Sequence, residues 1–124
     1  MNKINNFTDL KCWQEAHKLV LLVYETTEIF PKKEMFSLTS QLRRAVVSIT
    51  SNIAEGFSRL SIKEKIQFYN MSLGSVSEVQ NQIIIAKDVK YIFKEKYDLI
   101  LDQSIIVHKL INGSIKSLRK RNLS

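Results

Sequence analysis

The sequence predicts an all-α protein, an antiparallel up-down-up-down four-helix bundle, and three observations support this prediction. Only three glycines and one proline occur in 124 residues, which favours long helices because sandwiches and barrels need many turn residues. Apolar residues recur at helical spacing along four segments, and the loops between them are short. With 44% hydrophobic and 25% charged residues, residues 1–124 fit one globular domain. We expect the helices at about residues 9–29, 38–55, 62–90 and 95–118.

The first helix is expected to begin after Thr8. Threonine is a good N-cap, and Asp9 would lie in the first turn, where a negative charge is favourable. The helix must end before Pro31, because proline holds the preceding residue in extended geometry. The expected apolar stripe alternates spacings of three and four and comprises Leu10, Trp13, His17, Val20 and Tyr24.

The second helix contains the most informative segment, residues 40–57, which reads SQLRRAVVSITSNIAEGF. One side is an apolar stripe at coiled-coil spacing, formed by Leu42, Val46, Ile49, Ile53 and Phe57. Another face carries an ordered polar stripe, formed by Arg44, Ser48, Ser51, Asn52, Glu55 and Arg59. A helix with two ordered stripes is expected to make contacts on both faces, rather than to pack on one face and expose the other to water. Gly56 is expected to stop this helix.

The third helix is expected to open with a capping box at Ser61-Ile62-Lys63-Glu64. Its core stripe is predicted to comprise Ile62, Ile66, Tyr69, Leu73, Val76 and Ile83. A second stripe is built from small residues, namely Ser72, Ser75, Val79 and Ala86. Small side chains at helical spacing let another helix approach closely, so this helix is expected to contact neighbours on two sides.

The fourth helix carries apolar residues nearly all round, and they are Tyr97, Leu99, Leu101, Ile105, Ile106, Leu110, Ile111 and Ile115. This stripe is wider than one groove between three helices can cover, so another subunit is expected to bury part of it. The alternative is a slightly apolar surface. The residues predicted at an interface are Ser48, Asn52, Glu55, Ser72, Ser75, Val79, Leu99, Ile106 and Leu110.

Chemistry-bearing patterns are scarce. The sequence has no Gly-rich phosphate loop, no nucleophile elbow and no paired carboxylates. His17 and His108 each lack the glutamate three residues earlier that di-metal bundles use, so we interpret both as core or boundary residues. Cys12 is next to Trp13, which suggests packing. We therefore expect no catalytic residues, no metal, no cofactor and no enzymatic activity.

A lone cysteine excludes an internal disulfide, and no apolar run has the length of a signal peptide or a membrane span. A cytoplasmic location without membrane contact is therefore expected.

The net charge of +7 is uneven, because residues 94–124 carry seven basic and three acidic residues. In an antiparallel bundle, the second and fourth helices end at the pole where the third begins. One set of cations should therefore gather there, and we call it the basic pole: Arg59, Lys63, Lys65, Lys116, Arg119, Lys120 and Arg121. With Arg43 and Arg44, these are the candidate nucleic-acid-binding residues, because such cations suit phosphate oxygens. The alternative is a solvated helix end favoured by the helix dipole, with arginines paired to Glu55.

Residues 40–79, SQLRRAVVSITSNIAEGFSRLSIKEKIQFYNMSLGSVSEV, resemble the signature of the bacterial four helix bundle protein family, the 23S rRNA intervening sequence proteins. The flanking segments also fit, with a Trp-containing first helix, Phe30-Pro31 before the second helix and a basic closing helix. Thr50 stands where relatives often have proline, so no proline kink is expected there. The matching positions are Ser40, Gln41, Leu42, Arg43, Arg44, Ala45, Ser48, Ser51, Asn52, Ile53, Ala54, Glu55 and Gly56.

This resemblance implies a four-helix bundle that assembles into a homopentamer, with no established enzymatic activity. A similar bundle serves as the accessory protein of diversity-generating retroelements, where a basic pentamer works with a reverse transcriptase and nucleic acid. Two functional hypotheses remain open. The first is a cytoplasmic, non-enzymatic oligomer whose basic surface binds RNA or DNA backbone without sequence specificity. The second is a protein-interaction module in which the polar stripe and the apolar surplus serve assembly and docking of a protein partner.

Overall fold

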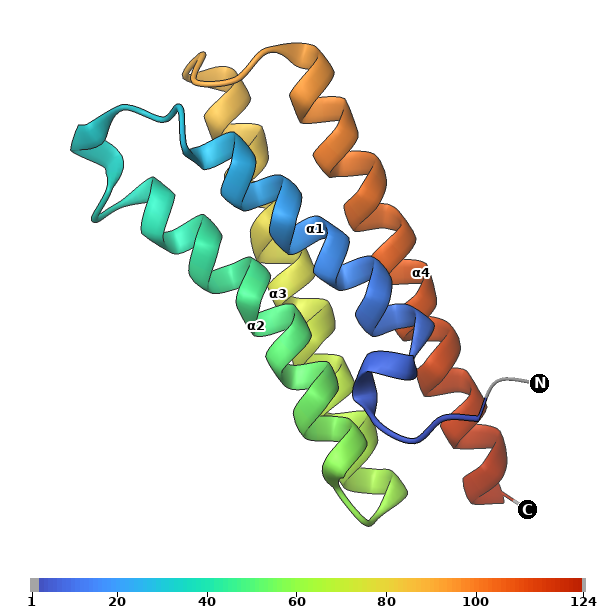
Figure 1. Cartoon of the computed structure of the whole chain (residues 1–124). Coiled ribbons are helices and arrows are strands. Elements are labelled where there is room, and N and C mark those ends of the chain that lie inside the picture. Colours follow the sequence, from blue (N-terminus) through green and yellow to red (C-terminus); the bar gives the residue numbers. More distant parts are fainter. Residues whose placement is uncertain (1–2, 124) are drawn as a thin grey trace.

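The computed structural model describes residues 3–123, and the chain in this range folds into four long helices (Figure 1). Each helix contacts its two neighbours in the order α1–α2–α3–α4–α1. This arrangement confirms the expected all-α four-helix bundle. The elements are η1 (Phe7–Asp9), α1 (Lys11–Thr27), η2 (Lys32–Glu34), α2 (Leu38–Ser58), α3 (Ile62–Asp88) and α4 (Lys94–Leu123).

The start of the first helix differs from the prediction. Asn6, not Thr8, is the cap, because its Oδ1 accepts a hydrogen bond from Thr8 N at 2.8 Å. Asp9 Oδ2 accepts from Asn6 N at 3.2 Å, which completes a capping box. This box closes the short 3-10 helix η1, and α1 begins only after Leu10. The sequence therefore does contain an N-cap in this region, but it caps η1 and not α1.

The buried face of α1 also differs from the predicted stripe. His17 and Tyr24 are exposed, and Trp13 is only half buried. Trp13 stacks on His17 with ring centroids 4.8 Å apart and is covered by Phe7 at 5.6 Å. The predicted stripe consists mostly of large side chains. The face that contains the small residues Cys12 and Ala16 is buried instead, because it can pack more closely against the neighbouring helices. The buried apolar residues of α1 are Cys12, Ala16, Leu19 and Val23.

Four of the five residues in the predicted apolar stripe of α2 lie in the core, with Leu42, Val46, Ile49 and Ile53 fully buried. The fifth, Phe57, is half buried at the end of the helix. The helix runs without interruption past Thr50 and continues through Gly56 to Ser58. Gly56 is therefore not the stop, and the expected end was wrong. A Cβ atom at Gly56 would lie 2.8 Å from Tyr69 Cε1 and 3.1 Å from Phe68 Cβ. The glycine is needed for the close approach of α3 rather than for helix termination.

The small residues of α3 face α2. Ser72 Oγ donates a hydrogen bond to the carbonyl oxygen of Ile49 at 2.6 Å, and Ser75 Oγ donates to Ser48 Oγ at 3.0 Å. These contacts confirm the expected close helix approach, and the helix involved is α2 of the same chain. At the start of α3, the Ser61 cap is confirmed, because its Oγ accepts from Glu64 N at 3.1 Å.

The turn between α3 and α4 depends on a left-handed residue, Lys90, with φ of 70°. Lys90 N donates to the carbonyl oxygen of Lys87 at 3.0 Å, and Tyr91 N donates to that of Ala86 at 2.9 Å. This is a Schellman motif without the usual glycine. The next helix, α4, passes through Gly113 and extends beyond the expected end at residue 118. Between residues 3 and 123, no helix is both long and apolar enough to cross a membrane.

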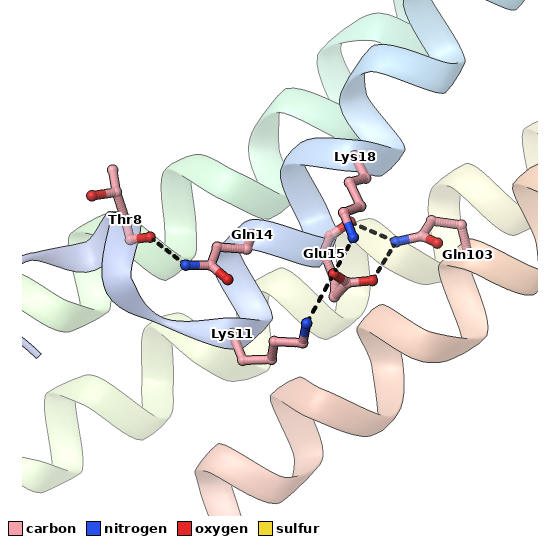
Figure 2. A network of polar contacts seen from close by, with 6 residues as sticks. All are labelled: Thr8, Lys11, Gln14, Glu15, Lys18 and Gln103. Carbon is pink, nitrogen blue, oxygen red and sulfur yellow. Dashed lines mark hydrogen bonds and ion pairs between the residues drawn. The ribbon is translucent and has the colours of Figure 1, made fainter. Parts of the chain in front are cut away.

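Helix α1 is joined to α4 by a polar network around Glu15 (Figure 2). Gln103 Nε2 donates to the Glu15 carbonyl oxygen at 2.9 Å and to Glu15 Oε1 at 3.2 Å. Lys18 Nζ and Lys11 Nζ lie 2.8 Å and 3.4 Å from Glu15 Oε2. Glu15 itself is only 7% exposed. The Lys18 ammonium and then the Gln103 amide lower the pKa of the Glu15 carboxyl to about 2, so this carboxylate stays ionised at neutral pH.

Candidate nucleic-acid interface

The basic pole lies at one end of the bundle. Figure 1 shows the end of α2, the start of α3 and the end of α4 at this same end. The antiparallel topology thus places together the helix termini that carry its seven cations. Their environments differ, however, and divide the pole into cations that support the fold and cations that face solvent.

Arg59 supports the fold. Its Nη2 lies 2.8 Å from Glu55 Oε2, and its guanidinium stacks 4.8 Å from the centre of the Phe68 ring. The arginine therefore ties the end of α2 to the start of α3. Glu55 is its ion-pair partner, as the alternative reading of the sequence expected.

Lys65 also supports the fold. Its Nζ donates hydrogen bonds to the carbonyl oxygens of Phe57 at 2.7 Å and Gly56 at 3.4 Å. The ammonium thereby caps the C-terminal end of α2 from the neighbouring helix, where the helix dipole favours a cation. Burial lowers the pKa of Lys65, and the nearby charge of Arg121 adds to this effect.

The other cations of the basic pole face solvent. Those with exposed side chains are Lys63, Lys116, Arg119, Lys120 and Arg121. Within residues 3–123, no ion pair involves Lys63, Lys116, Arg119 or Lys120. On α4, Lys116 and Lys120 are four residues apart and so lie on one helix face. Their charge is available to an anionic surface.

Arg43 and Arg44 lie elsewhere, because about 22 Å of helix separates them from the end of α2. Arg43 joins α2 to α1: its Nε donates to Thr27 Oγ1 at 2.9 Å, and its guanidinium lies 4.8 Å from the Tyr24 ring centre. Arg44 is exposed at the edge of a hollow between α2 and α3 that Gln82 also lines. The structure therefore does not bring these two arginines to the basic pole.

The predicted interface residues also separate into two groups. Ser72, Ser75 and Val79 are buried against α2, so the interface they form lies within the chain. Ser48 and Asn52 are half buried and bonded to each other, and Glu55 is exposed. Leu110 is half buried, whereas Leu99 and Ile106 on α4 are 52% and 43% exposed. Of the predicted interface residues, only those with some exposed surface can contact another molecule, and these are Ser48, Asn52, Glu55, Leu99, Ile106 and Leu110.

The remaining sequence candidates have simple surroundings. Cys12 is buried, and burial raises the pKa of its thiol, so it remains protonated. His108 is half buried with its Nδ1 3.2 Å from Asn112 Nδ2, as expected of a boundary residue. Among residues 3–123, no three His, Cys, Asp or Glu side chains are grouped as a metal site would require.

One cation was missed by the sequence interpretation. Lys109 is exposed on α4 and, with Lys65 and Arg121, lines a cavity of about 670 Å³ at the basic pole. We call this the pole cavity. Lys109 lies seven residues before Lys116, which is about two helical turns and puts both on one face. That spacing was the signal that could have identified it.

The fold and the basic pole define the class of protein, a small four-helix bundle with a cationic end. The chain belongs to the 23S rRNA-intervening sequence protein family, whose model matches residues 8–113. It is similar to a solved structure from Bacteroides thetaiotaomicron VPI-5482, described as a protein of unknown function from the S23 ribosomal protein family. The TM-score is 0.77 and the identity 23%, over 85% of this chain and 98% of that chain, which supports the fold. A comparison with curated proteins finds no match.

Proposed function

We propose that this protein is a non-enzymatic, cytoplasmic homo-oligomer whose basic pole binds the backbone of RNA or DNA without sequence preference. The observation that carries the proposal is a group of exposed cations, Lys63, Lys116, Arg119 and Lys120, that form no ion pair within residues 3–123. Phosphate contacts of this kind supply affinity but carry no base information. The sequence-independent charge of a helix end therefore suits a backbone, not a particular base sequence.

Binding should depend strongly on salt, because each phosphate contact releases counterions. Anisotropy titrations of a labelled single-stranded RNA at two salt concentrations measure this dependence. The double variant Lys116→Gln/Lys120→Gln should lower the slope of log K against log salt by about 1.4, since each contact contributes about 0.7 for single strands. The proposal is wrong if the unchanged protein binds neither RNA nor DNA at low salt.

A matched control has the same charge loss at the opposite end of the bundle. Lys32 and Lys33 are exposed in η2, between α1 and α2. The double variant Lys32→Gln/Lys33→Gln should leave both affinity and slope unchanged. Equal losses in the two double variants would point to total charge rather than to the basic pole.

Assembly is the second part of the proposal, and the family resemblance implies a homopentamer. A large exposed apolar area favours association, and α4 exposes Leu99, Ile105 and Ile106. Sedimentation should therefore give a native mass several times that of one 14.4 kDa chain. The double variant Leu99→Glu/Ile106→Glu should shift this mass toward the monomer.

The control for this variant uses two exposed apolar residues of the first helical hairpin, in the change Leu21→Glu/Ile29→Glu. It should keep the native mass of the parent protein. A stable monomer of the unchanged protein at micromolar concentration would remove the assembly proposal. A monomer only in the control variant would place the interface on α1 and the loop that follows it.

The alternative function is a protein-interaction module without a nucleic-acid role, and the exposed position of Arg44 beside Ser48 favours it. In that case Arg44→Ala should weaken oligomerisation or partner binding and leave RNA affinity unchanged. If the variant instead lowers RNA affinity and keeps the native mass, Arg44 belongs to the nucleic-acid surface.

A further inference from the structure

The pole cavity is bounded by the end of α2, by α3, by α4 and by the segment before α1. Its volume of about 670 Å³ lies within the range of small-molecule sites in proteins. Gly113 of α4 lines it, and a Cβ atom at this glycine would meet no other atom within 4 Å. The cavity is therefore open on the side where α4 has no side chain.

The lining combines an apolar bed with a cationic rim. Aliphatic and aromatic side chains form the bed, and they include Leu10, Phe57, Leu110 and Leu118. Leu118 is buried, and Leu10 and Leu110 pack against the core, so the bed is fixed by the fold. The rim carries three cations, Lys65, Lys109 and Arg121. No Asp or Glu lines the cavity within the described residues.

Two features of the lining favour an anionic group. Lys65 and Arg121 lie close enough for one charge to disfavour the other, and an anion between them would relieve this repulsion. Tyr69 also lines the cavity, and its hydroxyl makes no hydrogen bond within residues 3–123. Burial raises the pKa of Tyr69 to about 12, so the hydroxyl stays protonated and can donate to an anion at neutral pH.

We propose that the pole cavity binds a small amphipathic anion, a carboxylate or phosphate monoester that carries an aliphatic chain. The head group would lie between Lys65 and Arg121, and the chain would cover Leu110 and Leu118. Inorganic phosphate alone would leave the apolar bed exposed, and a cation with the same chain would meet the like charges of the rim. The inference does not depend on nucleic-acid binding.

Calorimetric titration with decanoate and decyl phosphate, below the concentrations at which they form micelles, tests the proposal. Both should bind, and octanoate should bind about tenfold more weakly than decanoate, because two methylenes are lost from the buried chain. Decyltrimethylammonium and inorganic phosphate should not bind measurably. Tighter binding of decanoate or of decyl phosphate identifies the preferred head group. Equal binding of decyltrimethylammonium, or no binding of either anion, overturns the proposal.

Gly113→Phe provides a variant that fills the cavity without disturbing the core. Its side chain extends into open space, and phenylalanine is a better helix former than glycine, so the variant should fold. It should reduce decanoate affinity by on the order of tenfold or more. Gly74→Phe is the matched control, because Gly74 is equally open but lies on α3 away from the cavity lining. Unchanged affinity in Gly113→Phe, or equal loss in both variants, contradicts the site.

The charged rim has its own matched pair. Arg121→Glu should weaken decanoate binding by about tenfold, because it replaces an attraction with a repulsion at the cavity edge. Lys120→Glu changes the same charge at the neighbouring residue, which is exposed but outside the lining. It should keep the affinity of the parent protein. If both variants lose the same affinity, the effect is long-range and the rim assignment is wrong.

Discussion

Gly56→Val is expected to lower the free energy of unfolding by about 2–3 kcal/mol, as overpacking of a close helix contact does. The first added carbon would already lie 2.8 Å from Tyr69 Cε1 and 3.1 Å from Phe68 Cβ. Tyr69 is a buried residue of α3, so the clash could be relieved only by moving its ring out of its packed position and toward the pole cavity. Urea denaturation of the variant and the parent protein at neutral pH measures this difference.

The control for this change is Gly74→Val, at a second α-helical glycine. Gly74 is exposed on α3, and an added Cβ atom would have no neighbour within 4 Å. This variant should be as stable as the parent or more stable by up to about 0.5 kcal/mol, because valine is a better helix former than glycine. Equal stability of the two valine variants would show that Gly56 is not required for packing.

Glu15→Ala is expected to lower the free energy of unfolding at pH 7 by about 1–3 kcal/mol, because it removes a buried acceptor and leaves Gln103 without a side-chain partner. The effect should depend on pH. The pKa of Glu15 is about 2 in the folded protein and near 4.5 when unperturbed, so the unfolded chain takes up the proton first as pH falls. The stabilisation is therefore complete above pH 4.5 and is lost between pH 4.5 and pH 2.

Denaturation of the parent protein and of Glu15→Gln at pH 7, 4 and 2.5 measures this loss. The stability difference between the two proteins should be largest at pH 7 and should shrink as pH falls. Glu34 also has a lowered pKa, because Ser37 and then Tyr91 donate hydrogen bonds to it, so the parent and the variant will share part of the acid destabilisation. A difference that stays constant from pH 7 to 2.5 would contradict the Glu15 network.

The buried face of a helix could be predicted from the sequence where the helix has only one strongly apolar face. In α2, the stripe that begins with Leu42 and Val46 is the only strongly apolar face, and it is buried as expected. In α1, two neighbouring faces both carried apolar residues at spacings of three and four. The larger side chains favour the face with Trp13, but the face with Cys12 and Ala16 is buried because small residues let α1 approach its neighbours. Periodicity alone cannot rank two such faces.

The basic pole followed from the topology, since any antiparallel four-helix bundle brings those helix termini to one end. The contacts that each cation makes could not be predicted from the topology. Lys65 is four residues into α3, and only the tertiary structure shows its Nζ on the carbonyl oxygens that end α2. Likewise Gly56 reads as a helix stop in the sequence, and its close contact with Tyr69 depends on how α2 and α3 pack. Contacts between distant segments are what a pattern along one helix cannot supply.

Cations are exposed at both ends of the bundle, but at the end opposite the basic pole acidic side chains such as Glu28 and Asp88 accompany them, so the molecule is electrically lopsided along its long axis. The dipoles of antiparallel helices largely cancel, so side-chain charges set the remaining moment. Arg59 and Lys65 make their contacts within the fold, so at the basic pole an approaching molecule meets mainly Lys63, Lys116, Arg119, Lys120 and Arg121. A polyanion in solution would tend to rotate the bundle so that the ends of α2 and α4 point toward it before contact. Orientation would precede docking, and it would fade as ionic strength rises.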